Sequence, residues 1–185
     1  MAWVSRLPLP ATLFYFLLWL VWYLLDTAVK WRDGAYPFGT FNTFHAVYVA
    51  TGPYLLAILH YIDRFAGASL ATFRPALDMD DAEYESLYYR MTNLPARQTL
   101  LASVIGPIYA AISLATTDPA RLDLLNLYTS PLASAIDIVA YMGGWAITGV
   151  FVYHTARQMW LINYIYTHRT RVDPYQLHPL FAFSR

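Results

Sequence analysis

Residues 132–172 place the strongest constraint on the fold, because Pro131 and Pro174 bracket them and no proline interrupts them. As one helix this stretch would be about 60 Å long at 1.5 Å per residue. Residues 138–156 carry no formal charge and are long enough to cross a bilayer, whereas residues 157–172 contain charged and polar side chains that need water. The sequence therefore predicts a membrane helix that continues as a cytoplasmic helix.

Three further uncharged stretches predict three more spans, over about residues 7–25, 43–62 and 98–117. Only 13% of the chain is charged, against about 25% in a soluble domain. The predicted fold is an all-α integral membrane four-helix bundle that occupies residues 1–172. Residues 173–185 contain several large apolar side chains and are interpreted as the start of a further, truncated element.

The basic residues predict the orientation, because cytoplasmic segments of membrane proteins are enriched in Lys and Arg. With the N-terminus inside, nine basic residues fall on the inner side and three on the outer side. The inner residues are Arg6, Arg64, Arg74, Arg90, Arg97, Arg157, Arg169, Arg171 and Arg185, and the outer ones are Lys30, Arg32 and Arg121. We expect a multi-pass protein of a prokaryotic cytoplasmic membrane with both termini cytoplasmic.

An amphipathic helix is predicted at the inner surface over about residues 79–92. Apolar side chains recur there at helical spacing, and acidic residues precede them as expected for a helix N-terminus. The apolar positions are Tyr84, Leu87, Tyr88 and Met91. Such a helix can lie on the membrane or pack on the helix formed by residues 157–172.

Two histidine pairs suggest haem as a cofactor. His45 and His60 lie on the second predicted span, and His154 and His168 on the fourth helix, at spacings that resemble the two-histidine helices of di-haem cytochrome b proteins. Only His60 and His154 share a membrane depth, so at most one bis-histidine haem b is predicted, near the inner face. The interpretation that we favour from the sequence is that both histidines are polar residues at helix ends, hydrogen-bonded to neighbours or water, with no cofactor.

A seam of side chains runs along the fourth helix in alternating steps of four and three. Its members are Ile147, Phe151, His154, Gln158, Leu161, Ile165, His168 and Val172. The seam predicts packing on the amphipathic helix or on a second copy of the chain. Higher in the same helix, Ala140, Gly144 and Thr148 form a ridge of small residues, with Gly143 beside it, that favours close helix packing.

An outer polar cluster is the remaining candidate site. Asp26, His45 and Asp137 all lie near the outer ends of their spans and could bind a cation or relay a proton. The interpretation that we favour from the sequence is that all three side chains are solvated at the interface.

Residues 73–95 and 154–185, particularly Pro179-Leu180-Phe181-Ala182-Phe183-Ser184, resemble stretches of uncharacterised multi-spanning prokaryotic membrane proteins. This resemblance implies no activity. The balance of basic and acidic residues gives no indication of nucleic-acid binding, and the lack of cysteine excludes disulfides and thiolate metal sites.

The expected function is a non-enzymatic membrane module that anchors, assembles or transmits a signal, as a homo-oligomer or in a larger complex. A b-type haem electron carrier and a small transporter or channel component are the alternatives.

Overall fold

The computed structural model describes Val4, residues 7–117 and residues 130–170. Five α-helices and one short 3-10 helix make up almost all of this part of the chain, and no strand occurs in it, so the all-α prediction is confirmed. The elements are α1 (Ala11–Arg32), α2 (Thr43–Phe73), η2 (Arg74–Ala76), α3 (Asp81–Thr92), α4 (Ala96–Thr116) and α6 (Pro131–His168).

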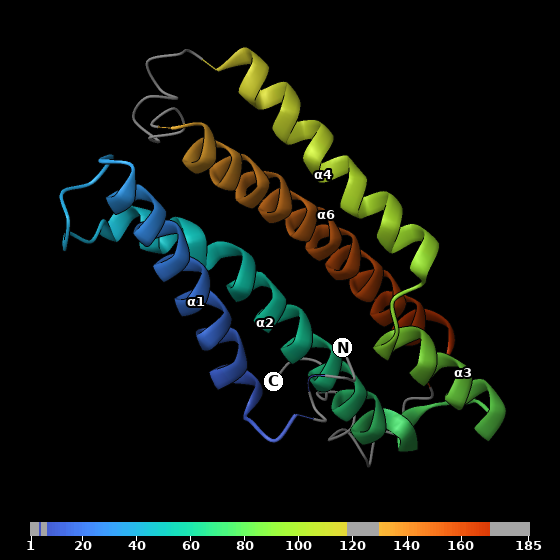
Figure 1. The fold of residues 1–185 in the computed structure, drawn as a ribbon. Coiled ribbons are helices and arrows are strands. Elements are labelled where there is room, and N and C mark those ends of the chain that lie inside the picture. Colours follow the sequence, from blue (N-terminus) through green and yellow to red (C-terminus); the bar gives the residue numbers. More distant parts are fainter. Residues whose placement is uncertain (1–3, 5–6, 118–129, 171–185) are drawn as a thin grey trace.

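The long helices form two antiparallel pairs, α1 with α2 and α4 with α6, and α6 also packs along α2 (Figure 1). The α4–α6 pair is held close by two glycines. A Cβ atom on Gly106 would lie 1.9 Å from the carbonyl oxygen of Trp145, and one on Gly149 would lie 2.3 Å from that of Ala102. Only the absence of side chains at both glycines lets the two backbones approach this closely.

Three stretches are long and apolar enough to cross a membrane, namely Ala11–Arg32, Asp81–Thr116 and Pro131–His168. The second of them joins α3 and α4. These stretches confirm three of the four predicted spans by length and composition. Helix α2 falls outside this set. It contains two histidines and the charged pair Asp63 and Arg64.

Helix α6 is one continuous helix of 38 residues. Ser130 caps its start, accepting a hydrogen bond from the backbone N–H of Ala133 at 3.1 Å, and Pro131 occupies the first turn. The Ser130 hydroxyl also donates to Asp33, just beyond α1, and this hydrogen bond lowers the pKa of the Asp33 carboxyl. The helix ends at His168. The predicted seam residue Val172 lies outside the described residues.

The first two helices extend beyond their predicted ends. Helix α1 continues to Arg32, past the end of the uncharged stretch at residue 25, and α2 continues to Phe73 instead of ending near residue 62. Both extensions contain charged residues that the sequence rule treats as the end of a span. In the structure Asp26, Lys30 and Asp63 are buried and paired, as described below, so these charges do not need to leave the bundle. Arg32 and Arg64 are exposed.

The hydrophobic core lies at the end of the bundle where α2, α3 and α6 meet. Helix α3 starts at the cap Asp80, whose carboxylate accepts from the Glu83 N–H at 2.7 Å, and it buries Leu87 and Met91. The core contains Ala66, Leu70, Phe73, Ala76, Leu77, Leu87, Met91, Leu161 and Ile165. Elsewhere many large apolar side chains are exposed, as in a protein that faces lipid.

Candidate functional site

A buried ionic cluster joins α1, α2 and α6 at the end of the bundle opposite α3. Its centre is Lys30, which has no exposed surface. The Lys30 ammonium donates to Asp26 at 3.1 Å and to Asp137 at 3.0 Å, and it lies 3.4 Å from both ring nitrogens of His45. His45 Nε2 also contacts the Asp26 carboxylate. One side chain from each of three helices therefore meets at the lysine.

Two of the four side chains of this cluster are brought together by the geometry of α1, and the other two by the packing of α2 and α6 beside it. Asp26 and Lys30 are four residues apart on α1, so they lie one above the other on the same helix face. His45 is in the first turn of α2 and Asp137 in the second turn of α6. These two turns lie beside the last turns of α1 (Figure 1).

The cation at the centre of this cluster is the ammonium group of Lys30. Asp26, His45 and Asp137 each offer a ligand atom, and these atoms lie within 4.8 Å of one another. The Lys30 ammonium contacts all three side chains, so it takes the place that a bound cation would take. One carboxylate oxygen on each of Asp26 and Asp137 nevertheless has no hydrogen-bond partner among the described residues.

The sequence interpretation of this cluster was wrong in one respect. Asp26, His45 and Asp137 do meet, but they are 2%, 7% and 3% exposed, so they are not solvated at the interface as we expected. Lys30 was missed because it was counted as a residue of the outer loop. The signal that could have found it is its i, i+4 spacing from Asp26 on an otherwise apolar helix.

A second buried polar group lies closer to the hydrophobic core. His154 Nε2 lies 3.0 Å from an Asp63 carboxylate oxygen and 3.1 Å from the Gln158 side-chain nitrogen. Gln158 also donates to the backbone carbonyl of Met91, at the end of α3, at 3.2 Å. These contacts connect α2, α3 and α6 next to the hydrophobic core.

The arrangement of these side chains does not favour the predicted haem pair. His154 Nε2 is engaged by Asp63 and Gln158 and is not free to ligate iron. His60 is buried, and neither ring nitrogen has a hydrogen-bond partner among the described residues. It lines a cavity of about 670 Å³ together with Asp63, but His154 does not line that cavity. The imidazole of His60 thus lines this cavity without that of His154.

The predicted seam is buried only in its central part. His154, Gln158, Leu161 and Ile165 are buried, whereas His168 is exposed. Leu161 and Ile165 pack in the core that α2 and α3 complete. The central part of the seam thus packs on helices of the same chain, including the amphipathic helix.

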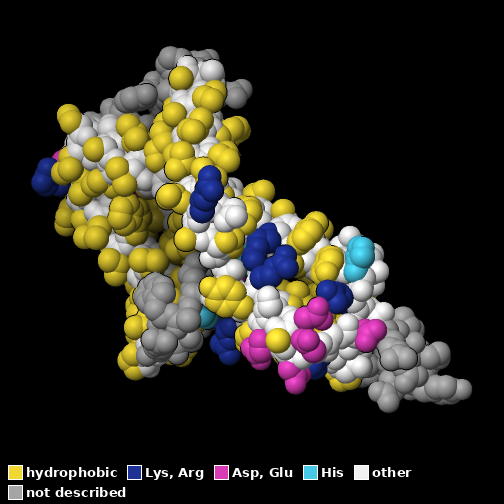
Figure 2. Space-filling model, turned by 90° about the vertical axis from the view of Figure 1, so that its right-hand side faces the viewer, with side chains coloured by type: hydrophobic (Ala, Val, Ile, Leu, Met, Phe, Trp, Pro, Cys, Tyr) yellow, Lys and Arg dark blue, Asp and Glu magenta, His cyan; other side chains and the backbone are white. Residues whose placement is uncertain are grey.

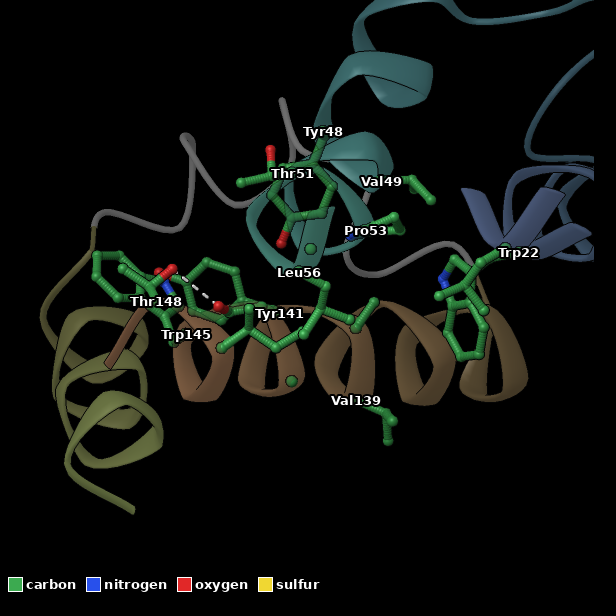
Figure 3. A pocket seen from close by; sticks show the side chains of 16 residues that line it. Trp22, Tyr48, Val49, Thr51, Pro53, Leu56, Val139, Tyr141, Trp145 and Thr148 are labelled. Atoms are coloured by element: carbon green, nitrogen blue, oxygen red, sulfur yellow. Dashed lines mark hydrogen bonds between the residues drawn. The ribbon is translucent and has the colours of Figure 1, made fainter. Parts of the chain in front are cut away.

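A groove of about 600 Å³ separates the α1–α2 pair from α6 (Figure 3). Tyr48 and Leu56 line it from α2, and Trp22 lies at its α1 side. The small-residue ridge of α6 lines the opposite wall. This ridge therefore faces an open groove instead of a tightly packed helix, and Gly106 and Gly149 make the close helix contact.

No known protein family, curated protein or solved structure matches this chain.

Proposed function

We propose that this chain is a non-enzymatic membrane module that transmits a change from the ionic cluster to the opposite end of the bundle. One observation supports this function. Helix α6 is a single uninterrupted helix that contributes Asp137 to the ionic cluster and Leu161 and Ile165 to the core with α2 and α3. At 1.5 Å per residue it is about 57 Å long.

In the proposed topology α2 also crosses the membrane, as the second of four spans, and both termini are cytoplasmic. The polar side chains of α2 are the reason that its hydropathy is low, but His45 and Asp63 are paired with α1 and α6 respectively. Pairing lowers the free-energy cost of burying such groups in a bilayer. Helix α2 also runs antiparallel to α1, as a returning span would (Figure 1).

The distribution of basic residues supports the same orientation. In Figure 2, Lys and Arg side chains gather between a mainly hydrophobic surface and the acidic end near α3. Arg90 and Arg97 are exposed there, and Arg157 donates to the carbonyl of Asn93 at 3.1 Å. At the other end of the bundle, Lys30 is neutralised by two carboxylates. The α3 end is therefore the cytoplasmic side of the proposed topology.

Transmission requires that the two ends of α6 respond together. Asp137 is fixed to α1 through Lys30, so a change in this contact would shift or rotate the start of α6. Because α6 is continuous, its motion would reach the contacts of Gln158 and Ile165 with α3. A homo-oligomer or a larger membrane complex would receive this motion at the cytoplasmic end.

A spin-label measurement tests this proposal, and the chain suits it because it has no cysteine. Nitroxides attached at Tyr89→Cys on α3 and Asn163→Cys on α6 report the distance between these helices in liposomes. We expect Asp137→Asn or His45→Gln to change the distance distribution. Arg32→Gln serves as the control, because it removes a charge at the same end of the bundle outside the cluster.

An identical distance distribution in folded Asp137→Asn, His45→Gln and unmodified protein would contradict transmission. The ionic cluster would then be a static connection between α1, α2 and α6.

A further inference from the structure

The geometry points to a membrane amphiphile with a cationic head group as the ligand of the groove between the α1–α2 pair and α6. This inference deepens the proposed function, since it names what the module would sense. The groove volume of about 600 Å³ lies within the range of roughly 300–1,000 Å³ that is typical of small-molecule sites. Its walls are mainly aliphatic and aromatic, as a hydrocarbon chain requires.

The groove is kept open by residues without side chains. Gly143 and Gly144 both line it, and a Cβ atom added to either would meet no atom within 4 Å. On the facing wall, a Cβ on Gly52 would meet only the side chain of Ile147, at 3.4 Å. Larger residues at these positions would project into the groove and fill it. In this stretch α6 has glycines where larger side chains would fit, so the space that those side chains would fill remains open.

One end of the groove lies beside the ionic cluster. Tyr48 is one helical turn beyond His45 on α2, and Tyr141 is one turn beyond Asp137 on α6. Both tyrosines line the groove. The groove therefore has two tyrosines within one helical turn of buried charged residues.

The charge of the cluster selects the head group. Two carboxylates face one ammonium, so the cluster has a net charge of minus one when His45 is neutral. Asp137 Oδ2 has no hydrogen-bond partner among the described residues, so it can accept a bond if the cluster opens toward the groove. An ammonium head group at Tyr48 and Tyr141 would supply both a positive charge and hydrogen-bond donors. A carboxylate or phosphate head group would be repelled.

The size of the groove argues against a helix as its occupant. A helix with side chains is about 10–12 Å across and rises 5.4 Å per turn, so one turn fills on the order of 500 Å³. The groove of about 600 Å³ therefore accommodates little more than one turn. A single hydrocarbon chain from the surrounding lipid fits this volume better than a helix of a second copy does.

Photolabelling of the full chain in liposomes tests the inference. The probe is hexadecylamine with a diazirine in its chain, and hexadecanoic acid with the same diazirine is the comparison. We expect the amine to label groove residues, unlabelled hexadecylamine to suppress this labelling, and the acid to label them weakly. Gly144→Leu should lower the suppressible amine labelling by roughly tenfold or more, because its side chain fills the groove.

Val152→Leu is the matched control, because Val152 is 60% exposed on α6 and does not line the groove. It should label like the unmodified protein. Circular dichroism and gel filtration establish that both variants are folded, and Gly143→Leu provides a second filling variant. Tyr48→Phe combined with Tyr141→Phe should reduce the preference for the amine over the acid.

Three outcomes would overturn the inference. The first is equal suppressible labelling of Gly144→Leu and the unmodified protein, and the second is equal labelling by the amine and the acid. The third is loss of self-association in Gly144→Leu without suppressible labelling of the unmodified chain, which would identify a second copy as the occupant. The spin-label experiment uses no ligand, so a negative photolabelling result would not change the outcome of the test of transmission.

Discussion

At the scale of single residues, Lys30 has the largest structural role. It is fully buried and is bound by two carboxylates and a histidine that belong to three different helices. Removing one partner of a buried ion pair leaves an uncompensated charge, which is usually more costly than the pair was favourable. Lys30 therefore determines whether Asp26 and Asp137 can stay inside the bundle.

We expect Lys30→Met to destabilise the folded protein by about 3–5 kcal/mol, because Asp26 and Asp137 would remain buried without a counter-charge. Unfolding by denaturing detergent, followed by circular dichroism, measures the change. Adding Asp26→Asn and Asp137→Asn to Lys30→Met should recover part of the loss. Arg32→Met should have little effect on stability, because the Arg32 side chain is 72% exposed. An equally small loss of stability in Lys30→Met would refute the role assigned to Lys30.

At the scale of helices, the two faces of α6 use small residues for opposite purposes. Gly149 lies against α4 with no room for a side chain, whereas Gly143 and Gly144 border open space. The small-residue ridge predicted from the sequence contained Gly144 but neither Gly106 nor Gly149. Spacing along one helix shows that a helix can be approached closely, but it does not show on which side the neighbour lies.

We expect Gly106→Ala and Gly149→Ala each to destabilise the protein by about 1–3 kcal/mol, because the new methyl group would overlap the facing backbone. Gly143→Ala is the matched control. It should be neutral or stabilise α6 by up to about 1 kcal/mol, since alanine favours a helix more than glycine does. The same unfolding measurement in detergent compares the three variants. Equal effects at Gly106, Gly149 and Gly143 would mean that α4 does not pack closely on α6.

At the scale of the whole molecule, the structure consists of a bundle whose two ends differ. One end contains the ionic cluster, and the other contains the hydrophobic core, the amphipathic helix α3 and most of the basic side chains. Helix α2 connects these ends between α1 and α3. In the chain, α2 lies between the α1–α2 connection and α3, so its crossing of the membrane places these two segments on opposite sides.

Single cysteines at Phe38, between α1 and α2, and at Tyr89, on α3, test this topology. Both side chains are well exposed, at 88% and 66%, and the natural chain contains no cysteine. We expect a membrane-impermeant maleimide added to intact cells to label Phe38→Cys only, and to label Tyr89→Cys after the cells are opened. Labelling of both from the same side would show that α2 does not span the membrane.

The sequence alone determined the features that depend on neighbouring residues. The apolar stretches indicated helices suited to a membrane, Pro131 marked the start of α6, and the acidic residues before Tyr84 marked the start of α3. These features follow from local hydrogen bonding, side-chain sterics and the periodicity of a helix.

Tertiary structure decided the burial of Lys30, because its partner Asp137 lies 107 positions away. It also decided that α2 continues past Asp63, since the packing of α6 places His154 beside that carboxylate. A charge on a helix signals the end of a span only when nothing pairs with it, and pairing depends on which helices meet.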